Sequence, residues 1–290
     1  MTGFTVALPS GYRPDWVLSY HGRDPDGPAE RVQDSRITKA LDLPGGPVLL
    51  TIDIGTEVAS CAADRALSDA ELSTTSHIAA RMLGVATDVS GLERWAAEDP
   101  QVAKLLGDRI GLRPALTATV WEGLVWAIVG QQVNLRFAGT LRRTLIELAG
   151  TPHPSGRIAH PGPAAVARLD PEELGQRKFS RAKAAYLIGA AQAAVEGRVD
   201  YEALPGMTPE AAEARLTGLK GIGPWTRQYL LLRACGFPDC VPAGDAGLAA
   251  GLQRFHGLER RPTPEEQKQL MAPYAPFRSL ATAHMWAGFA

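Results

Sequence analysis

Hydrophobic and polar positions change their period about a third of the way along the chain. Before that point, residues 48–55 (VLLTIDIG) are rich in β-branched side chains and alternate in part, and residues 57–64 (EVASCAAD) can pair with them. Ser68 or Asp69 then begins a helical pattern, because both side chains cap helix N-termini well. We therefore predict a small mixed α/β domain over residues 1–87, in which an antiparallel sheet packs with a helix.

From residue 88 to residue 290 strand signals disappear, and apolar side chains recur at the helical spacing of three and four. Most segments start at Ser, Thr, Asp or Gly and stop at Gly, and one unbroken pattern runs over residues 119–150. Residues 151–163 are the exception, because their Pro, Gly and His content predicts a surface loop. The region 88–290 is therefore predicted to be an all-helical body of about nine or ten short helices, and the fold class is α+β.

The composition is that of an ordinary globular protein. With 290 residues, 45% of them apolar and 21% charged, the chain can bury a sizeable core without disulfides or metals. It has no apolar run approaching ~20 residues and no N-terminal signal pattern, so we expect a cytoplasmic protein without a membrane span. Cys61, Cys235 and Cys240 suit neither a disulfide framework nor a four-cysteine metal or iron–sulfur site, and free thiols are expected.

The formal net charge of −1 argues neither for nor against a nucleic-acid partner, because a neutral protein can carry a local basic face. Two basic runs are present, and each taken alone favours a solvated helix face. They consist of Arg177, Lys178, Arg181 and Lys183, and of Arg136, Arg142 and Arg143.

The turn TGLKGIGPW, between two helical patterns, is the most informative stretch. Pro224 is preset for the first position of the second helix, and Gly221 and Gly223 leave the turn without side chains. A second backbone can then come close, and the unpaired N–H groups of the new helix point outward, which suits a phosphate. A helix-hairpin-helix element of this kind grips a DNA backbone without reading bases. A tight corner between two packed helices explains the same glycines equally well.

Aromatic side chains and one carboxylate follow the turn. Trp225 and Tyr229 are four residues apart and share one helix face, either as a core pair or as a functional pair. Asp245 lies ~15 residues beyond that helix and directly before another helical pattern, where an N-cap is the plain interpretation. Both roles are compatible, because a helix N-terminus keeps a carboxylate ionised and able to face developing positive charge.

These features resemble the helix-hairpin-helix superfamily of base-excision DNA glycosylases, whose signature is the hairpin, a Gly/Pro-rich loop and an Asp. Within it, the chain is similar to the bacterial 3-methyladenine DNA glycosylase II branch (AlkA type) over nearly its whole length. The resemblance implies a monofunctional enzyme that flips alkylated bases out of duplex DNA and hydrolyses their N-glycosidic bond, in a cleft between two lobes. The matching motifs are DWVLSYHGR, WEGLVWAIVGQQV, GIGPWTRQYLLLRA, PAGDAGL and YAPFRSLATAHMW.

The resemblance assigns the chemistry to a small group of residues. Asp245 becomes the catalytic carboxylate, which stabilises the oxocarbenium-like sugar left by the departing base. Bases such as 3-methyladenine and 7-methylguanine already carry positive charge, which electron-rich aromatic faces favour. The expected pocket walls are Trp225, Tyr229, Trp286 and, from the N-terminal domain, Tyr20.

The resemblance also predicts how DNA is held. Gln132 falls where a side chain wedges into the duplex, and hairpin amides are expected to bind phosphate. Hairpin carbonyls are expected to bind a structural Na⁺ or K⁺. The resemblance implies that no cofactor is required and that the protein acts on double-stranded DNA as a monomer. The amides are those of Gly221, Gly223 and Thr226, and the carbonyls are those of Thr217, Leu219 and Gly221.

The chain departs from the resemblance at several positions. Trp225 stands where lyase members carry a nucleophilic lysine, so no lyase activity is expected, and the four clustered cysteines of iron–sulfur members are absent. Gln132 is polar where the AlkA branch has an apolar wedge, and Ala246 follows the Asp where that branch has a large aromatic side chain. The smaller residue predicts a more open pocket that also admits 1-methyladenine and 3-methylcytosine. In the alternative, Tyr20 or Trp286 fills the space.

Two other functions stay open from the sequence. One is a glycosylase for another lesion, such as uracil or an oxidised purine. The other is a non-catalytic helix-hairpin-helix DNA-binding protein, which would keep the glycines but has no use for an isolated Asp245 among aromatic residues.

Overall fold

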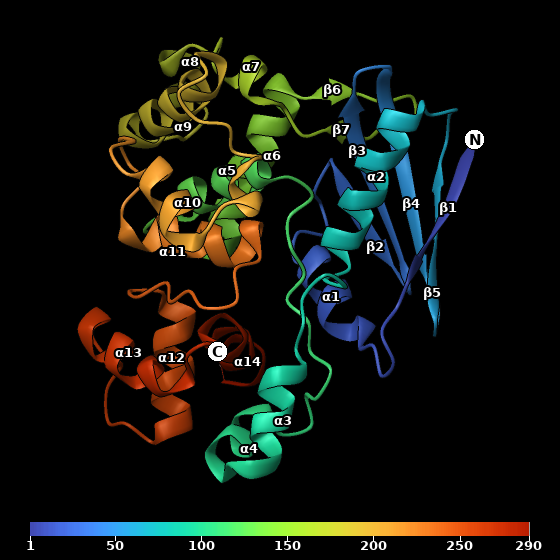
Figure 1. The fold of residues 1–290 in the computed structure, drawn as a ribbon. Helices are drawn as coiled ribbons and strands as arrows, with labels where there is room; N and C mark the ends of the chain where they lie inside the picture. The colour runs from blue at the N-terminus through green and yellow to red at the C-terminus, as the bar shows by residue number, and fades with distance from the viewer. Residues whose placement is uncertain (290) are drawn as a thin grey trace.

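The computed structural model describes residues 1–289, which form a sheet domain beside two helical lobes (Figure 1). The sheet has five antiparallel strands in the order β1-β5-β4-β3-β2, and it is accompanied by two helices. The bounds are β1 Thr2–Ala7, α1 Pro14–His21, β2 Glu30–Gln33, β3 Arg36–Leu43, β4 Gly46–Ile54, β5 Val58–Ala63 and α2 Asp69–Met82.

Two of these strands are the ones that the alternating pattern predicts. Strands β4 and β5 pair in antiparallel register with Ile52 opposite Cys61, and alternate side chains of β4 are buried. Leu50 and Ile52 lie in one core with Met82 of α2, so the buried face of the sheet is the face that the helix covers. Strands β1, β2 and β3 extend the sheet beyond the two strands that the sequence indicates.

Helix α2 begins at the predicted cap. The Ser68 hydroxyl accepts a hydrogen bond from the Glu71 amide, and the Glu71 carboxylate accepts one from the Ser68 amide. This reciprocal capping box satisfies two of the amides that a helix start leaves unpaired.

The second region is helical, as predicted, and the described part of it contains twelve α-helices. The number exceeds nine or ten partly because the pattern over residues 119–150 is broken by a turn between α5 and α6. No helix among residues 1–289 is both long and apolar enough to cross a membrane. The bounds are α3 Ser90–Glu98, α4 Pro100–Leu106, α5 Val120–Gly130, α6 Leu135–Ala149, β6 Thr151–Pro152, β7 Ile158–Ala159, α7 Pro163–Val166, α8 Pro171–Gln176, α9 Arg181–Val195, η1 Leu204–Gly206, α10 Pro209–Leu216, α11 Pro224–Leu230, η2 Leu231–Cys235, α12 Ala246–His256, α13 Pro264–Met271, η3 Ala272–Tyr274 and α14 Arg278–Phe289.

The helices form two lobes with separate cores. Helices α5 to α11 share one apolar cluster, whereas α3 and α4 join α12 to α14 around a second one that contains Leu105, Leu252 and Met285 (Figure 1). The second lobe is therefore built from two segments that are far apart in the sequence. The segment between η2 and α12 crosses from one lobe to the other, which places the start of α12 near both.

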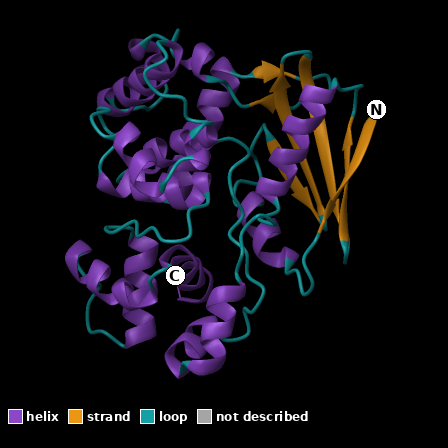
Figure 2. Cartoon of the chain, viewed as in Figure 1, coloured by secondary structure: helices purple, strands orange, loops and turns teal. Residues whose placement is uncertain are grey.

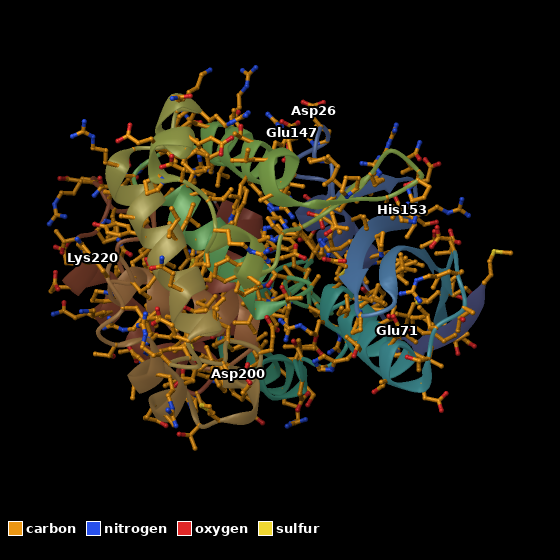
Figure 3. All side chains as sticks on the ribbon, turned by 90° about the horizontal axis from the view of Figure 1, so that it is seen from above. Asp26, Glu71, Glu147, His153, Asp200 and Lys220 are labelled. Atoms are coloured by element: carbon orange, nitrogen blue, oxygen red, sulfur yellow. The ribbon has the colours of Figure 1, made fainter. Side chains whose placement is uncertain are left out.

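The prediction of a surface loop over residues 151–163 holds for the exposed turn at 154–156 and is wrong for the residues on either side of it. The short hairpin β6–β7 lies against β3, and Figure 2 shows these two strands next to the main sheet. His153, labelled in Figure 3, is buried with its Nε2 2.9 Å from Oδ2 of Asp64, and the Ile158 amide donates to the Pro28 carbonyl. The polar composition misleads because these partners come from a distant part of the chain.

Buried charges join the sheet domain to the helical body. Lys39 of β3 places its Nζ 2.8 Å from Oε2 of Glu122 in α5 and 3.4 Å from Oε2 of Glu30. Arg142 of α6 lies 3.3 Å from Glu122 and 3.5 Å from Glu30. Burial disfavours the ionised form of Glu30, but Lys39 and Arg142 outweigh it and hold the pKa of Glu30 well below its ordinary value. Because a buried charge is stable only with its partners, this network fixes strands β2 and β3 of the sheet domain against α5 and α6 of the helical body.

Candidate active site

The predicted hairpin between α10 and α11 is present, and its two glycines have different surroundings. Gly221 has φ of +84°, and an added Cβ would lie 2.1 Å from the ring of Tyr186, so tight packing requires this glycine. Gly223 is exposed, and an added Cβ there would meet no atom within 4 Å. It is the N-cap of α11 and provides no side-chain cap, so room for a second backbone exists at Gly223.

The hairpin is tied to the turn between α5 and α6. The side-chain amide of Gln131 donates to the Gly221 carbonyl oxygen at 2.8 Å and to the hydroxyl of buried Thr226 at 3.0 Å. Lys183 of α9 donates from its Nζ to the carbonyl oxygens of Val129 and Gln131, at 2.5 and 2.7 Å. The turn that presents Gln132 therefore has a fixed position relative to the hairpin.

Gln132 itself is exposed at this turn with φ of +54°, and the apolar side chain of Leu135 nearby is 73% exposed. The expectation that the two basic runs are solvated helix faces is wrong for Lys183 and Arg142, which are buried. Both donate to buried acceptors of neighbouring helices, a role that charge patterning alone does not show.

The hairpin carbonyls predicted to bind a cation are already partly engaged. The Leu219 carbonyl accepts from the Ile222 amide at 3.1 Å, and the Gly221 carbonyl accepts from Gln131. A carbonyl oxygen has two lone pairs, so each keeps one for a monovalent cation. The donor set therefore fits such an ion.

Asp245 is the N-cap of α12, and three N–H groups point at its carboxylate. Oδ1 accepts from the Leu248 amide at 2.8 Å and from the indole of Trp286 at 2.9 Å. Oδ2 accepts from the indole of Trp225 at 3.3 Å. All three partners are donors, which matches the acceptor-only ionised carboxylate. The helix-cap interpretation of Asp245 is confirmed, and the site-carboxylate interpretation stays a prediction with which this geometry is compatible.

The predicted aromatic residues gather beside this carboxylate. The ring centroids of Trp225 and Tyr229 are 5.3 Å apart, and those of Tyr229 and Trp286 are 6.0 Å apart. Trp225 and Tyr229 come from α11 and Trp286 from α14, so the two lobes meet here. Burial raises the pKa of Tyr229, with Tyr20 adding to the shift, so this side chain remains a neutral phenol.

Two arginines that sequence reasoning missed lie in the same cluster. The Cζ atom of Arg233 is 4.6 Å from the ring centroids of both Tyr20 and Trp286. The Cζ atom of Arg23 is 3.9 Å from the Tyr20 centroid and 4.6 Å from that of Trp126. Arg233 follows Tyr229 by four residues, so the helical spacing offered a signal for it. These contacts also bring Tyr20 of the sheet domain to the site.

Two further positions singled out in the sequence are exposed. Lys220 is exposed on the hairpin, and Figure 3 shows it at an outer edge of the helical body. Ala246 is exposed in the first turn of α12.

The model of the HhH-GPD superfamily of base excision DNA repair proteins matches residues 125–276, which contain the hairpin and Asp245. That match covers more than half of the chain. The chain belongs to this superfamily. Its fold and its motifs therefore agree with the resemblance that the sequence indicates.

Individual relatives agree with the family assignment. A DNA-3-methyladenine glycosylase of Bacillus subtilis is 31% identical over 202 residues, 69% of this chain and 67% of that protein. A probable bifunctional transcriptional activator/DNA repair enzyme AlkA of Mycobacterium tuberculosis is 28% identical over 89% of this chain, which spans about half (51%) of that relative. A 3-methyladenine DNA glycosylase structure from Archaeoglobus fulgidus superposes with a TM-score of 0.84 at 20% identity, covering 98% of this chain and 97% of that one.

Proposed function

We propose that the protein is a monofunctional DNA glycosylase of base excision repair that releases alkylated bases, such as 3-methyladenine and 7-methylguanine, from duplex DNA. The observation that carries the proposal is the carboxylate of Asp245, held at a helix N-terminus by the indole N–H groups of Trp225 and Trp286. The names of the B. subtilis and M. tuberculosis relatives support the substrate class.

In this mechanism the bond between C1′ of the sugar and the base nitrogen breaks, and its electron pair leaves with the base. The sugar becomes oxocarbenium-like, and the ionised carboxylate of Asp245 stabilises the positive charge. The alkylated base leaves as a neutral molecule, and water adds to C1′ through an oxygen lone pair and loses its extra proton to solvent. Oδ2 of Asp245 accepts one hydrogen bond whereas Oδ1 accepts two, so Oδ2 keeps free acceptor capacity for the sugar or the water.

Alkylated bases suit this site for two reasons. They are positively charged before the bond breaks, so they depart without a general acid. Their charge also favours stacking on the electron-rich faces of Trp225, Tyr229 and Trp286, by ~0.5 to 2 kcal/mol per contact. Extrusion from the duplex costs a few kcal/mol and is easiest for weakened pairs.

The hairpin is proposed to hold the DNA backbone through amides near Gly223, with Gln132 filling the gap that the extruded base leaves. Phosphate contacts of this kind position the protein without reading sequence. A Na⁺ or K⁺ held by the carbonyls of Thr217, Leu219 and Gly221 would supply positive charge next to the phosphate. Because all proposed contacts come from one chain, a monomer is expected to suffice.

The absence of lyase activity is part of the proposal. Trp225 occupies the register position of a Schiff-base lysine, and Lys220 is exposed on the hairpin. Borohydride treatment during turnover should therefore trap no covalent complex with DNA. A trapped adduct that disappears in Lys220→Ala would contradict this.

The deciding experiment measures free base released from duplexes that carry single lesions, using wild type and Asp245→Asn. We expect release of 3-methyladenine and 7-methylguanine by wild type, and loss of it in the variant with DNA binding retained, since Asn still caps α12. More than a tenth of the wild-type single-turnover rate in the variant would exclude Asp245 as the catalytic carboxylate. Release of uracil or an oxidised purine instead would indicate another lesion, and binding without release would indicate a non-catalytic protein.

A further inference from the structure

Arg233 lies over Trp286, which the proposed function assigns to the flipped base, and over Tyr20, the pocket wall that the sequence predicts from the N-terminal domain. Its Cζ atom lies over the rings of Tyr20 and Trp286, 4.6 Å from each centroid. A guanidinium is planar, delocalised and positively charged, and it stacks on aromatic rings. An alkylated base shares these properties, so the side chain and the lesion compete for the same surfaces.

Arg233 is held there more weakly than its neighbour Arg23. Arg23 donates to the Tyr20 carbonyl at 2.5 Å, and the carboxylates of Glu30 and Asp24 act on it. For Arg233, the hydrogen bond to the Ala115 carbonyl is longer, at 3.3 Å, whereas the Nε atoms of both arginines are buried without a hydrogen-bond partner among the described residues. Of the two arginines, Arg233 is therefore the one that a ligand can displace.

The backbone that carries Arg233 is fixed. Residues Leu231–Cys235 form a π-helical turn, a feature common at functional sites. The Thr117 amide donates to the Arg233 carbonyl at 3.3 Å, and Arg81 of α2 donates to the Ala234 carbonyl at 2.5 Å. Displacement then requires only rotation of the side chain, without movement of the helix.

We propose that Arg233 is a specificity-determining residue whose guanidinium closes the lesion site in the free enzyme and must swing away before a base can stack between the lobes. This inference rests on the proposed function. If the open arrangement has population f, the apparent affinity of every base falls by that factor. A tightly held lesion still fills the site, whereas an undamaged, weakly held base is extruded in proportion to f. Arg233 therefore sets a threshold that protects undamaged bases from excision.

The test compares wild type with Arg233→Met, which keeps side-chain length and removes the charge, and with Arg233→Lys, which keeps the charge and loses the planar group. Binding of free 3-methyladenine is measured by isothermal titration calorimetry. We expect Arg233→Met to lower its Kd by about 2- to 30-fold, the factor to which a cation–π contact of ~0.5 to 2 kcal/mol converts, and Arg233→Lys to lower it less. Arg198→Met, at an exposed ion pair with Glu196, is the matched control and should leave Kd unchanged.

The second measurement is single-turnover release from duplex already bound to enzyme. Arg233→Met should release unmodified guanine about 2- to 30-fold faster than wild type, and 7-methylguanine faster by no more than that factor. Weaker binding and slower release in Arg233→Met would mean that Arg233 is a base ligand, which overturns the inference. No change in either quantity, or no binding of 3-methyladenine to any variant, also overturns it. Absence of release by wild type would instead refute the proposed function, while the calorimetry still decides the role of Arg233.

Discussion

The indole N–H of Trp286 lies 2.9 Å from Oδ1 of Asp245, so a tryptophan of the last helix holds the carboxylate at the start of α12. Trp286 therefore both borders the proposed base site and positions the charged group. Trp286→Phe keeps an aromatic face but removes this donor. We expect the single-turnover release of 3-methyladenine to fall about 5- to 13-fold, from a lost hydrogen bond of ~1 to 1.5 kcal/mol.

Trp225→Phe is the matched comparison, because its hydrogen bond to the same carboxylate is longer at 3.3 Å. A smaller loss of rate is expected there. Equal rates for wild type and Trp286→Phe would show that the hydrogen bond does not position Asp245 during the reaction.

The two hairpin glycines should respond differently to alanine. At Gly221 an added Cβ meets the Tyr186 ring at 2.1 Å on a backbone with φ of +84°, so Gly221→Ala should lower both the thermal midpoint and DNA affinity. Gly223 has φ of −74°, and an added Cβ there meets free space. Gly223→Ala should therefore leave the thermal midpoint unchanged. If the backbone approaches phosphate there, affinity should fall equally for damaged and undamaged duplex, as measured by fluorescence anisotropy at two salt concentrations. A loss confined to damaged DNA would place Gly223 at the base pocket instead.

The sequence could predict those features of the fold and the site that depend on residues close together in the chain. Alternation identified β4 and β5, a cap residue identified the start of α2, and the short spacing from the hairpin led to Trp225 and Asp245. Arg233 and Arg23 were missed as site residues, because Arg233 reaches Tyr20, and Arg23 reaches Trp126, only when the sheet domain docks on the helical body. That docking depends on the buried pairing of Lys39 with Glu122, which are 83 positions apart in the chain. Neither periodicity nor charge patterning carries information about such partners.

Buried His160 should make the protein sensitive to acid. Burial lowers its pKa to about 4 from an ordinary value of 6.5, against the opposing effect of Glu122. Below pH 6.5 the unfolded chain binds a proton that the folded His160 does not, so the stability it contributes is lost as pH falls from 6.5 toward 4. The free energy of unfolding should fall by at most about 1.4 kcal/mol per pH unit from this one group. Glu30 and Glu122 have lowered pKa values, so they change the pH dependence of the free energy of unfolding only below about pH 4.5.

His160→Asn is the test, because its side-chain N–H can replace Nδ1 opposite the Pro161 carbonyl. Urea unfolding between pH 4.5 and 7.5 should give a shallower pH dependence than wild type. His77→Asn, at an exposed histidine of α2, is the control and should keep the wild-type slope. If the slope of His160→Asn matches wild type, another buried group such as His284 carries the acid sensitivity.

The substrate range is expected to be wide because Ala246 follows Asp245 where a large aromatic residue stands in the AlkA branch. Ala246 is exposed, so a tyrosine can be accommodated there without disturbing the core. We predict that wild type releases 1-methyladenine and 3-methylcytosine, which are cationic and poorly paired, and that Ala246→Tyr releases them at least about fivefold more slowly. Release of 3-methyladenine should change less. Gln253→Tyr, near the far end of α12, is the control for an added aromatic side chain and should behave as wild type in quantification of free base. The prediction is contradicted if wild type releases neither lesion, or if Ala246→Tyr releases both as fast as wild type does. Other side chains then close the site, and Arg233, which lies over Tyr20 and Trp286, is the first residue to mutate.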